Sequence, residues 1–110
     1  MSLYGQYVKE RENINVIETE GGFVSYFISK NFIFIKDLYV IPELRMTGIA
    51  SGLADEVAEI GLDAGCTKMS CTVAIDTNNA TESLKASLSY GFKLDSLDSA
   101  NNLIYLSKEI

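Results

Sequence analysis

The residues whose types and spacing most clearly indicate a binding site lie between positions 37 and 51, where an apolar run is followed by a proline and then by a glycine. The run ends at Ile41-Pro42-Glu43, and Gly48 precedes a stretch with helical periodicity. At the start of a helix the first amide N–H groups have no partner within the helix, so they can converge on an anion. A glycine there lets the anion approach the backbone. The pattern indicates a phosphate-binding turn between a strand and a helix; a tight turn that binds nothing is the alternative.

Other phosphate loops and the commonest catalytic groups are excluded. The segment has no lysine after a second loop glycine, as a Walker loop needs, and the chain has no Gly-x-Gly-x-x-Gly, as a dinucleotide fold needs. Histidine is absent, which removes the usual general base, the Ser-His-Asp triad and most catalytic zinc sites. Any base must therefore be a carboxylate, a tyrosine, a water molecule or the substrate.

The two cysteines, Cys66 and Cys71, have no histidine or further cysteine to complete a metal site. We expect them to be packing residues in a reducing, cytoplasmic protein. Residues 9–12 are charged where a signal peptide would be apolar, and no apolar run could span a bilayer. The sequence therefore predicts no membrane association.

Composition predicts one domain over residues 1–110, of which 47% are hydrophobic. The net charge of −6 disfavours binding to nucleic acid or anionic membrane. A cationic or amine partner fits this charge; a charge that serves only solubility is the alternative.

Periodicity and turn signals predict a mixed α/β pattern. Strand 32–41 is apolar on both faces, which favours a central position in the sheet. Strand, helix and strand over residues 32–75 form a right-handed crossover that places the helix start beside the gap between the two strands. The expected strands are 14–18, 23–29, 32–41, 67–75, 92–97 and 103–107, and the expected helices are 48–64 and 80–89.

The segment Arg45-Met46-Thr47-Gly48-Ile49-Ala50 resembles the acyl-CoA loop of the GNAT superfamily of N-acyltransferases. The family pattern is Arg or Gln, two residues, Gly, one residue, then Gly or Ala. Its element order is an antiparallel meander, a β-α-β crossover with that loop, a second helix, a Gly-Phe pair and a closing hairpin. This chain matches from about residue 14 to its end, with Gly91-Phe92 as the pair. The resemblance implies a GNAT-like fold, acetyl-CoA as cofactor, and a small-molecule or peptide amine as acceptor.

The resemblance also implies which residues contact the cofactor. Strands would splay at Leu38–Val40 and Cys71–Val73, so that pantetheine pairs with the backbone of Leu38 and Val40. Asn79 and Ser83 would contact pantetheine or the nucleotide; helix capping and a solvated helix face are their alternatives. Arg45 would add positive charge at the pyrophosphate, or it would lie at the surface and only steer the cofactor toward the site. The pyrophosphate would meet the backbone N–H groups of Met46, Thr47, Gly48, Ile49, Ala50 and Ser51.

The implied reaction is direct attack of a neutral amine on the thioester, with an amide near Leu38 stabilising the oxyanion. Asp37 is the nearest carboxylate, in an otherwise apolar strand where burial would make it a stronger base; an edge or surface role is its alternative. Ser87 stands four residues before Gly91, where many GNAT enzymes have a tyrosine as general acid. Because a serine hydroxyl is a much weaker acid, an acyl-CoA-binding sensor or interaction module is the rival function.

The front of the chain departs from the family. About thirteen residues precede the first strand, which leaves room for one short helix rather than the usual strand and helix pair. The acceptor pocket is then abbreviated, built by a partner subunit, or absent. Apolar sheet surface around Phe23, Tyr26 and Phe32 would lack a cover, so we expect a homodimer that buries it.

Overall fold

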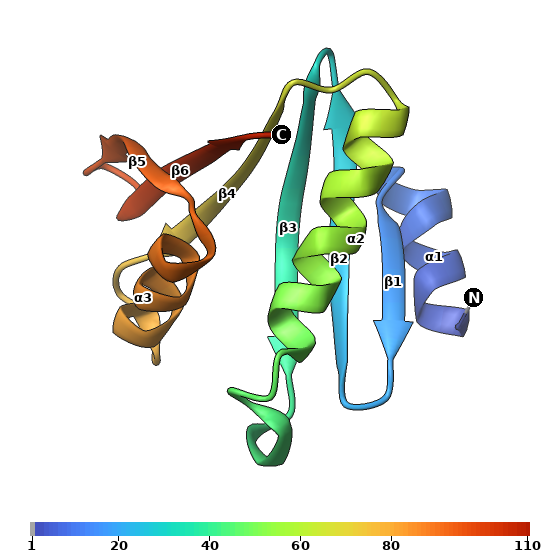
Figure 1. Cartoon of the computed structure of the whole chain (residues 1–110), viewed down its shortest axis with the longest axis horizontal. Helices are drawn as coiled ribbons and strands as arrows, with labels where there is room; N and C mark the ends of the chain where they lie inside the picture. The colour runs from blue at the N-terminus through green and yellow to red at the C-terminus, as the bar shows by residue number, and fades with distance from the viewer. Residues whose placement is uncertain (1) are drawn as a thin grey trace.

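The computed structural model describes residues 2–110 and shows six strands in one sheet, in the order β1-β2-β3-β4-β6-β5 (Figure 1). The predicted mixed α/β architecture is confirmed. A short 3-10 helix, η1 (Pro42–Leu44), was not predicted. The strands are β1 (Asn15–Thr19), β2 (Gly22–Ser29), β3 (Phe32–Val40), β4 (Lys68–Ala74), β5 (Lys93–Asp98) and β6 (Leu103–Glu109), and the α-helices are α1 (Leu3–Glu12), α2 (Ile49–Asp63) and α3 (Ala80–Tyr90).

The expected single helix at the front is α1, which lies along the edge strand β1 (Figure 1). The Ser2 side chain caps it by accepting a hydrogen bond from the N–H of Gly5 at 3.0 Å. No helix within residues 2–110 is long and apolar enough to cross a membrane.

A β-bulge in β3 decides which of its side chains face the core. Ser25 of β2 pairs with Asp37, but its neighbour Tyr26 pairs with Ile35, so Lys36 is an extra residue. An extra residue shifts the alternation of side chains by one position. The buried positions are therefore Ile33 and Ile35 before the bulge, but Val40 after it.

This alternation decides two expectations. Of the two roles left open for Asp37, a buried base is wrong and a surface carboxylate is confirmed, because the bulge turns its side chain away from the core and leaves it exposed. Tyr26 was expected on an uncovered surface, but it is only 8% exposed and belongs to the core. The aromatic side chains of the outer face are instead Phe23, which contacts Tyr39, and Phe27, which stacks on Phe34.

Helix α2 covers the central strands with the predicted apolar stripe, in which Leu53, Val57 and Gly61 are buried (Figure 1). The helix ends at Asp63, and Gly65 follows the capping residue with a φ of 85°. The N–H of Cys66 then reaches back to the carbonyl of Gly61 at 2.8 Å, the bond of a Schellman cap.

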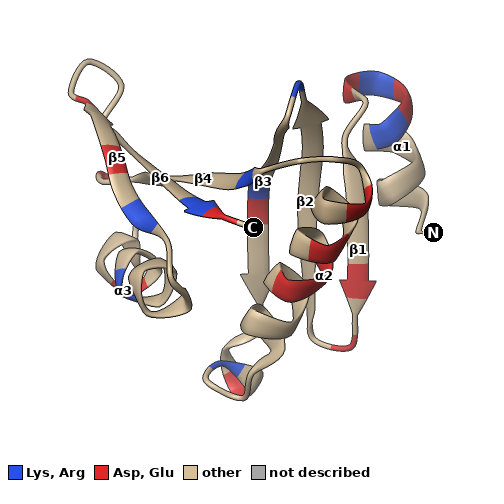
Figure 2. Ribbon diagram, turned by 45° about the horizontal axis from the view of Figure 1, so that its top comes forward, with Lys and Arg blue, Asp and Glu red and all other residues tan. Residues whose placement is uncertain are grey.

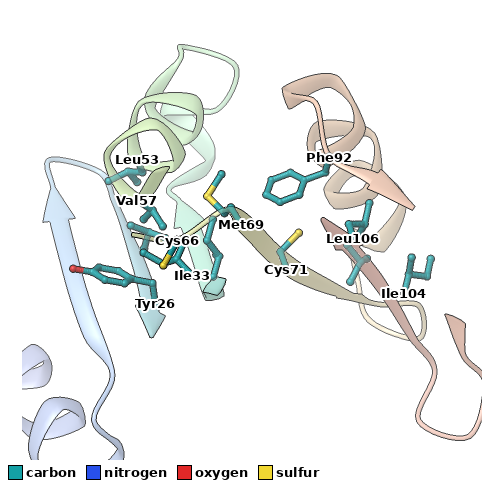
Figure 3. Packing of buried hydrophobic residues seen from close by; sticks show 13 residues of the cluster. Tyr26, Ile33, Leu53, Val57, Cys66, Met69, Cys71, Phe92, Ile104 and Leu106 are labelled. Atoms are coloured by element: carbon teal, nitrogen blue, oxygen red, sulfur yellow. The ribbon is translucent and has the colours of Figure 1, made fainter. Parts of the chain in front are cut away.

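The core has two parts that meet at Met69, which has no exposed surface (Figure 3). One part lies under α2 and includes Ile33 and Cys66; the other includes Cys71 and Phe92. Both cysteines are buried packing residues, as predicted.

The contact between α2 and β3 gives a matched stability test. A Cβ at Gly61 would lie 2.8 Å from Cγ2 of Ile33, whereas one at Gly52 on the same helix would meet no atom within 4 Å. Gly61→Ala should therefore lower the free energy of unfolding by about 1–2 kcal/mol through overpacking. Gly52→Ala should raise it by about 0.5–1 kcal/mol, because alanine restricts the unfolded chain. Urea denaturation measures both; equal effects of the two variants would contradict the close approach of α2 to β3.

Candidate functional site

The parallel ladder between β3 and β4 is short. The strands pair at Phe32 with Lys68, Ile33 with Met69, and Phe34 with Ser70. Beyond these pairs β3 remains bonded to β2 and β4 to β6, so the two halves of the sheet diverge into a V (Figure 1). The predicted splaying at Leu38–Val40 and Cys71–Val73 is confirmed.

A cavity of about 240 Å³ occupies this V between α2 and α3. Among the predicted site residues, Leu38, Ala50, Ser51, Ser83 and Ser87 line it. The lining also includes Tyr90 and Phe92. Predicted residues that do not line it are Asp37, Val40, Arg45, Met46, Thr47, Gly48, Ile49 and Asn79.

The loop before α2 presents a run of free amide donors. Within residues 2–110, no protein acceptor pairs with the backbone N–H groups of residues 46 to 51, and the first helical bond runs from Gly52 to the carbonyl of Gly48 at 2.9 Å. Met46 and Gly48 have positive φ values of 62° and 94°, and a Cβ at Gly48 would meet no atom within 4 Å. An anion can therefore approach these donors closely.

The charges on α2 leave its positive end uncompensated. The first turn has no acidic residue. The carboxylates begin at Asp55 and continue toward the other end of the helix, and α2 carries no Lys or Arg (Figure 2). The partial positive charge at the start of the helix therefore remains available to a ligand.

Arg45 holds the loop against the end of β3. Its Nε donates a hydrogen bond to the carbonyl of Val40 at 3.0 Å, and its guanidinium lies 5.8 Å from the ring centroid of Tyr39. The hydroxyl of Thr47 donates to the carbonyl of Leu44 and closes the preceding turn. The sequence pointed to Arg45 as a ligand contact and gave no sign of this structural role.

The α3 side of the cavity is polar. Asn79 occupies the N-cap position of α3, but its side chain makes no capping hydrogen bond. Helix capping by this side chain, the alternative to a cofactor contact, is therefore wrong. Ser87 donates its hydroxyl hydrogen to the carbonyl of Ser83 at 2.9 Å. Burial raises the pKa of Cys71 to about 11, and a hydrogen bond with Ser87 opposes that shift. The Cys71 thiol therefore stays protonated and is a poor nucleophile.

Tyr90 ties α3 to α2. Its hydroxyl donates to Oδ1 of Asp55 at 2.7 Å, and no other hydrogen bond or ion pair joins the two helices within residues 2–110. Burial and the Asp55 carboxylate both raise the pKa of Tyr90 above its usual range. Its ring lies 5.7 Å from Phe92 and 5.8 Å from Nζ of Lys108. The sequence carries no signal for the contact between Tyr90 and Asp55, because the two residues are 35 positions apart in the chain.

Comparison with known proteins points to one family. The sequence model of the Acetyltransferase (GNAT) family matches residues 6–88. Thialysine N-epsilon-acetyltransferase from Bos taurus is 39% identical over 54 residues, which cover 49% of this chain and 32% of that protein.

Two solved structures share the fold. The PaiA N-acetyltransferase from Thermoplasma acidophilum, in complex with coenzyme A, has a TM-score of 0.78 and 19% identity over 98% of this chain and 69% of its own. Nourseothricin acetyltransferase has a TM-score of 0.75 and 25% identity over 81% of this chain and 57% of its own. The chain thus spans about a third of the bovine relative and over half of each of these structures.

The hydrogen bond between Tyr90 and Asp55 predicts an unusual titration of Tyr90. Because the fold favours the neutral phenol, Tyr90 should ionise above the ordinary value of about 10, and Asp55→Asn should move that ionisation to lower pH. The ultraviolet absorbance of tyrosinate measures this, with Tyr90→Phe identifying the signal. Asp63→Asn, another exposed carboxylate of α2, is the control. An ionisation of Tyr90 unaffected by Asp55→Asn would contradict the contact.

Proposed function

Because the chain belongs to the GNAT acetyltransferase family, we propose that it binds acetyl-CoA in the V between β3 and β4 and transfers the acetyl group to an amine. The observation that carries this proposal is the loop of free amide donors at the start of α2, beside strands that have parted. A polyanionic cofactor with an extended arm matches both features: its phosphates need donors, and its arm needs strand partners.

The proposed cofactor contacts follow this geometry. Pantetheine pairs with the backbone of Leu38 and Val40, and the pyrophosphate binds the N–H groups of residues 46 to 51. Asn79 and Ser83 contact pantetheine or the nucleotide from α3. The side chain of Asn79 is exposed and makes no capping hydrogen bond, which supports its role as a cofactor contact. Arg45 contributes mainly by holding the loop to Val40, because that contact already uses its Nε.

In the proposed reaction a neutral amine attacks the thioester carbonyl, and an amide near Leu38 stabilises the oxyanion. The amine loses one proton and the departing thiolate gains one. Asp37 acts as the base, and its exposure on the face away from α2 supports contact with an amine arriving from that side. Ser87 lines the cavity as the candidate acid, but its hydrogen is already donated to Ser83, so we expect slow transfer.

The rival function is an acyl-CoA-binding sensor or interaction module without useful transfer activity. Ser87 in place of a phenolic acid is the observation that favours it. Thiol release from acetyl-CoA in the presence of small amines or peptides separates the two functions: the enzyme releases thiol, and the module binds acetyl-CoA without release. We further propose a cytoplasmic setting, where acetyl-CoA is available and the buried cysteines stay reduced.

Binding of acetyl-CoA should stabilise the fold. At a hundred times its dissociation constant the gain is about 2.7 kcal/mol, visible as a rise in melting temperature. Gly48→Asp should abolish the rise, because it places a carboxylate where phosphate oxygens approach. Gly65→Asp is the matched control, since Gly65 has a similar φ of 85° and equally open surroundings at the other end of α2. Arg45→Ala should weaken binding by about tenfold or less.

Three results would contradict this site. One is the absence of any shift at millimolar CoA in folded protein. Another is an equal loss of binding in Gly48→Asp and Gly65→Asp. The third is a larger loss in Arg45→Ala than in Gly48→Asp at the same folded fraction, which would refute binding by the backbone amides.

We also propose a homodimer that covers the outer face of β2 and β3 at the end that carries Phe23 and Tyr39. The ring contact between these two residues and the 45% exposure of Tyr39 support this. Light scattering should give twice the monomer mass at tens of micromolar, and Phe23→Lys should give the monomer. Leu62→Lys, at an exposed position of α2, should leave the dimer intact. A monomer in the unmodified protein would refute the dimer and favour the binding module.

A further inference from the structure

A second hollow, of about 300 Å³, lies at the point where β3 and β4 part. Its lining includes Phe34 and Ser70, the last residue pair of the parallel ladder. Their neighbours Ile35 and Cys71 line the cavity between α2 and α3. Successive side chains of a strand point to opposite faces of a sheet. The hollow and the cavity therefore lie back to back on the two faces of the sheet, beside the opening between the strands.

The walls of the hollow are aromatic, and its one charged lining residue is Asp95. The rings of Phe27 and Phe34 stack at 5.1 Å, and Tyr105 forms another wall. Asp95 is the extra residue of a bulge in β5, because Leu94 pairs with Leu106 but Ser96 pairs with Tyr105. Bulges commonly redirect a side chain.

The Asp95 carboxylate has no cationic partner within 4.0 Å in the part of the chain that the structure describes. Three lysines lie on β4, β5 and β6 near this position, and one of them, Lys108 of β6, points its Nζ at the ring of Tyr90. Lys93 lies two residues before Asp95 on β5, and Lys68 lies two residues before Ser70 on β4, directly opposite Glu109 of β6. None of the three lysines lines the hollow.

Aromatic faces beside an uncompensated carboxylate suit an ammonium group, which gains from both the ring quadrupoles and the opposite charge. We propose that this hollow anchors one charged amino group of an acceptor that carries two, and that it thereby selects aliphatic diamines and lysine-like compounds. The anchored group stays protonated beside Asp95. The other amino group, joined by a methylene chain, extends into the opening between β3 and β4. This inference rests on the proposed acetyl transfer.

The roles of the two amino groups differ chemically. The attacking nitrogen must be neutral, so it gains nothing from a permanent carboxylate contact. The anchored nitrogen benefits from its charge, and it positions the other end without taking part in bond formation. Removal of the Asp95 charge should therefore weaken acceptor binding more than it slows acetyl transfer.

The test compares a linear aliphatic diamine with the monoamine of the same chain length, using acetyl-CoA-dependent thiol release. We expect a KM for the diamine at least tenfold lower than for the monoamine. Asp95→Asn should raise the diamine KM by about tenfold with little change in kcat, and should leave the monoamine unaffected. Asp63→Asn, an exposed carboxylate at the end of α2, should change neither amine.

A second readout separates this inference from the acetyltransferase itself. Diamine binding is followed by NMR shifts of the Phe27 and Tyr105 rings without acetyl-CoA, and acetyl-CoA binding is measured for each variant by melting temperature. Failure of every variant to bind acetyl-CoA would refute the proposed function, whereas ring shifts that depend on Asp95 would still support the hollow as a diamine site. Equal affinity for both amines, or equal behaviour of Asp95→Asn and Asp63→Asn, would overturn the inference.

Discussion

The constraint on which the site depends is the length of the parallel ladder between β3 and β4. Each strand is fixed on its other side, β3 by β2 and β4 by β6, so neither can turn to close the gap beyond Phe34 and Ser70. Backbone groups that face the gap then require another partner. The same separation keeps α2 and α3 apart, and the bond between Tyr90 and Asp55 is what joins them across the cavity.

Patterns local to the sequence predicted most of the fold. The stripe of Leu53, Val57 and Gly61 identified α2 because its spacing depends only on helical geometry. The β-branched residues Thr72, Val73 and Ile75 identified β4, in which alternate residues from Met69 to Val73 are buried. The loop before α2 was recognised for the same reason, since strand, turn and helix start are adjacent in the chain.

Features that depend on pairing between distant segments could not be predicted. One extra residue, Lys36, decides that Asp37 faces outward, and its position follows from the register with β2 rather than from β3 itself. The contact between Tyr90 and Asp55 likewise joins helices 35 residues apart in sequence. Arg45 was singled out by its motif, but its bond to Val40 depends on how the loop folds back on β3. The roles of the candidate catalytic residues were the hardest to predict, because they depend on which face of the sheet each side chain occupies.

The two faces of the V differ in the charge that they offer. On the α2 side, free amides and the helix dipole present positive potential at the start of α2, whose first turn has no acidic residue. On the opposite side, Asp37 is an exposed carboxylate, and Asp95 is an exposed carboxylate that lines a hollow with aromatic walls. A polyanion and a cationic amine would thus each meet a face of opposite charge, and the opening between the strands is where they could react. The overall charge of −6 is therefore less informative than its distribution, since an acidic chain can still offer phosphate one local site of the opposite sign.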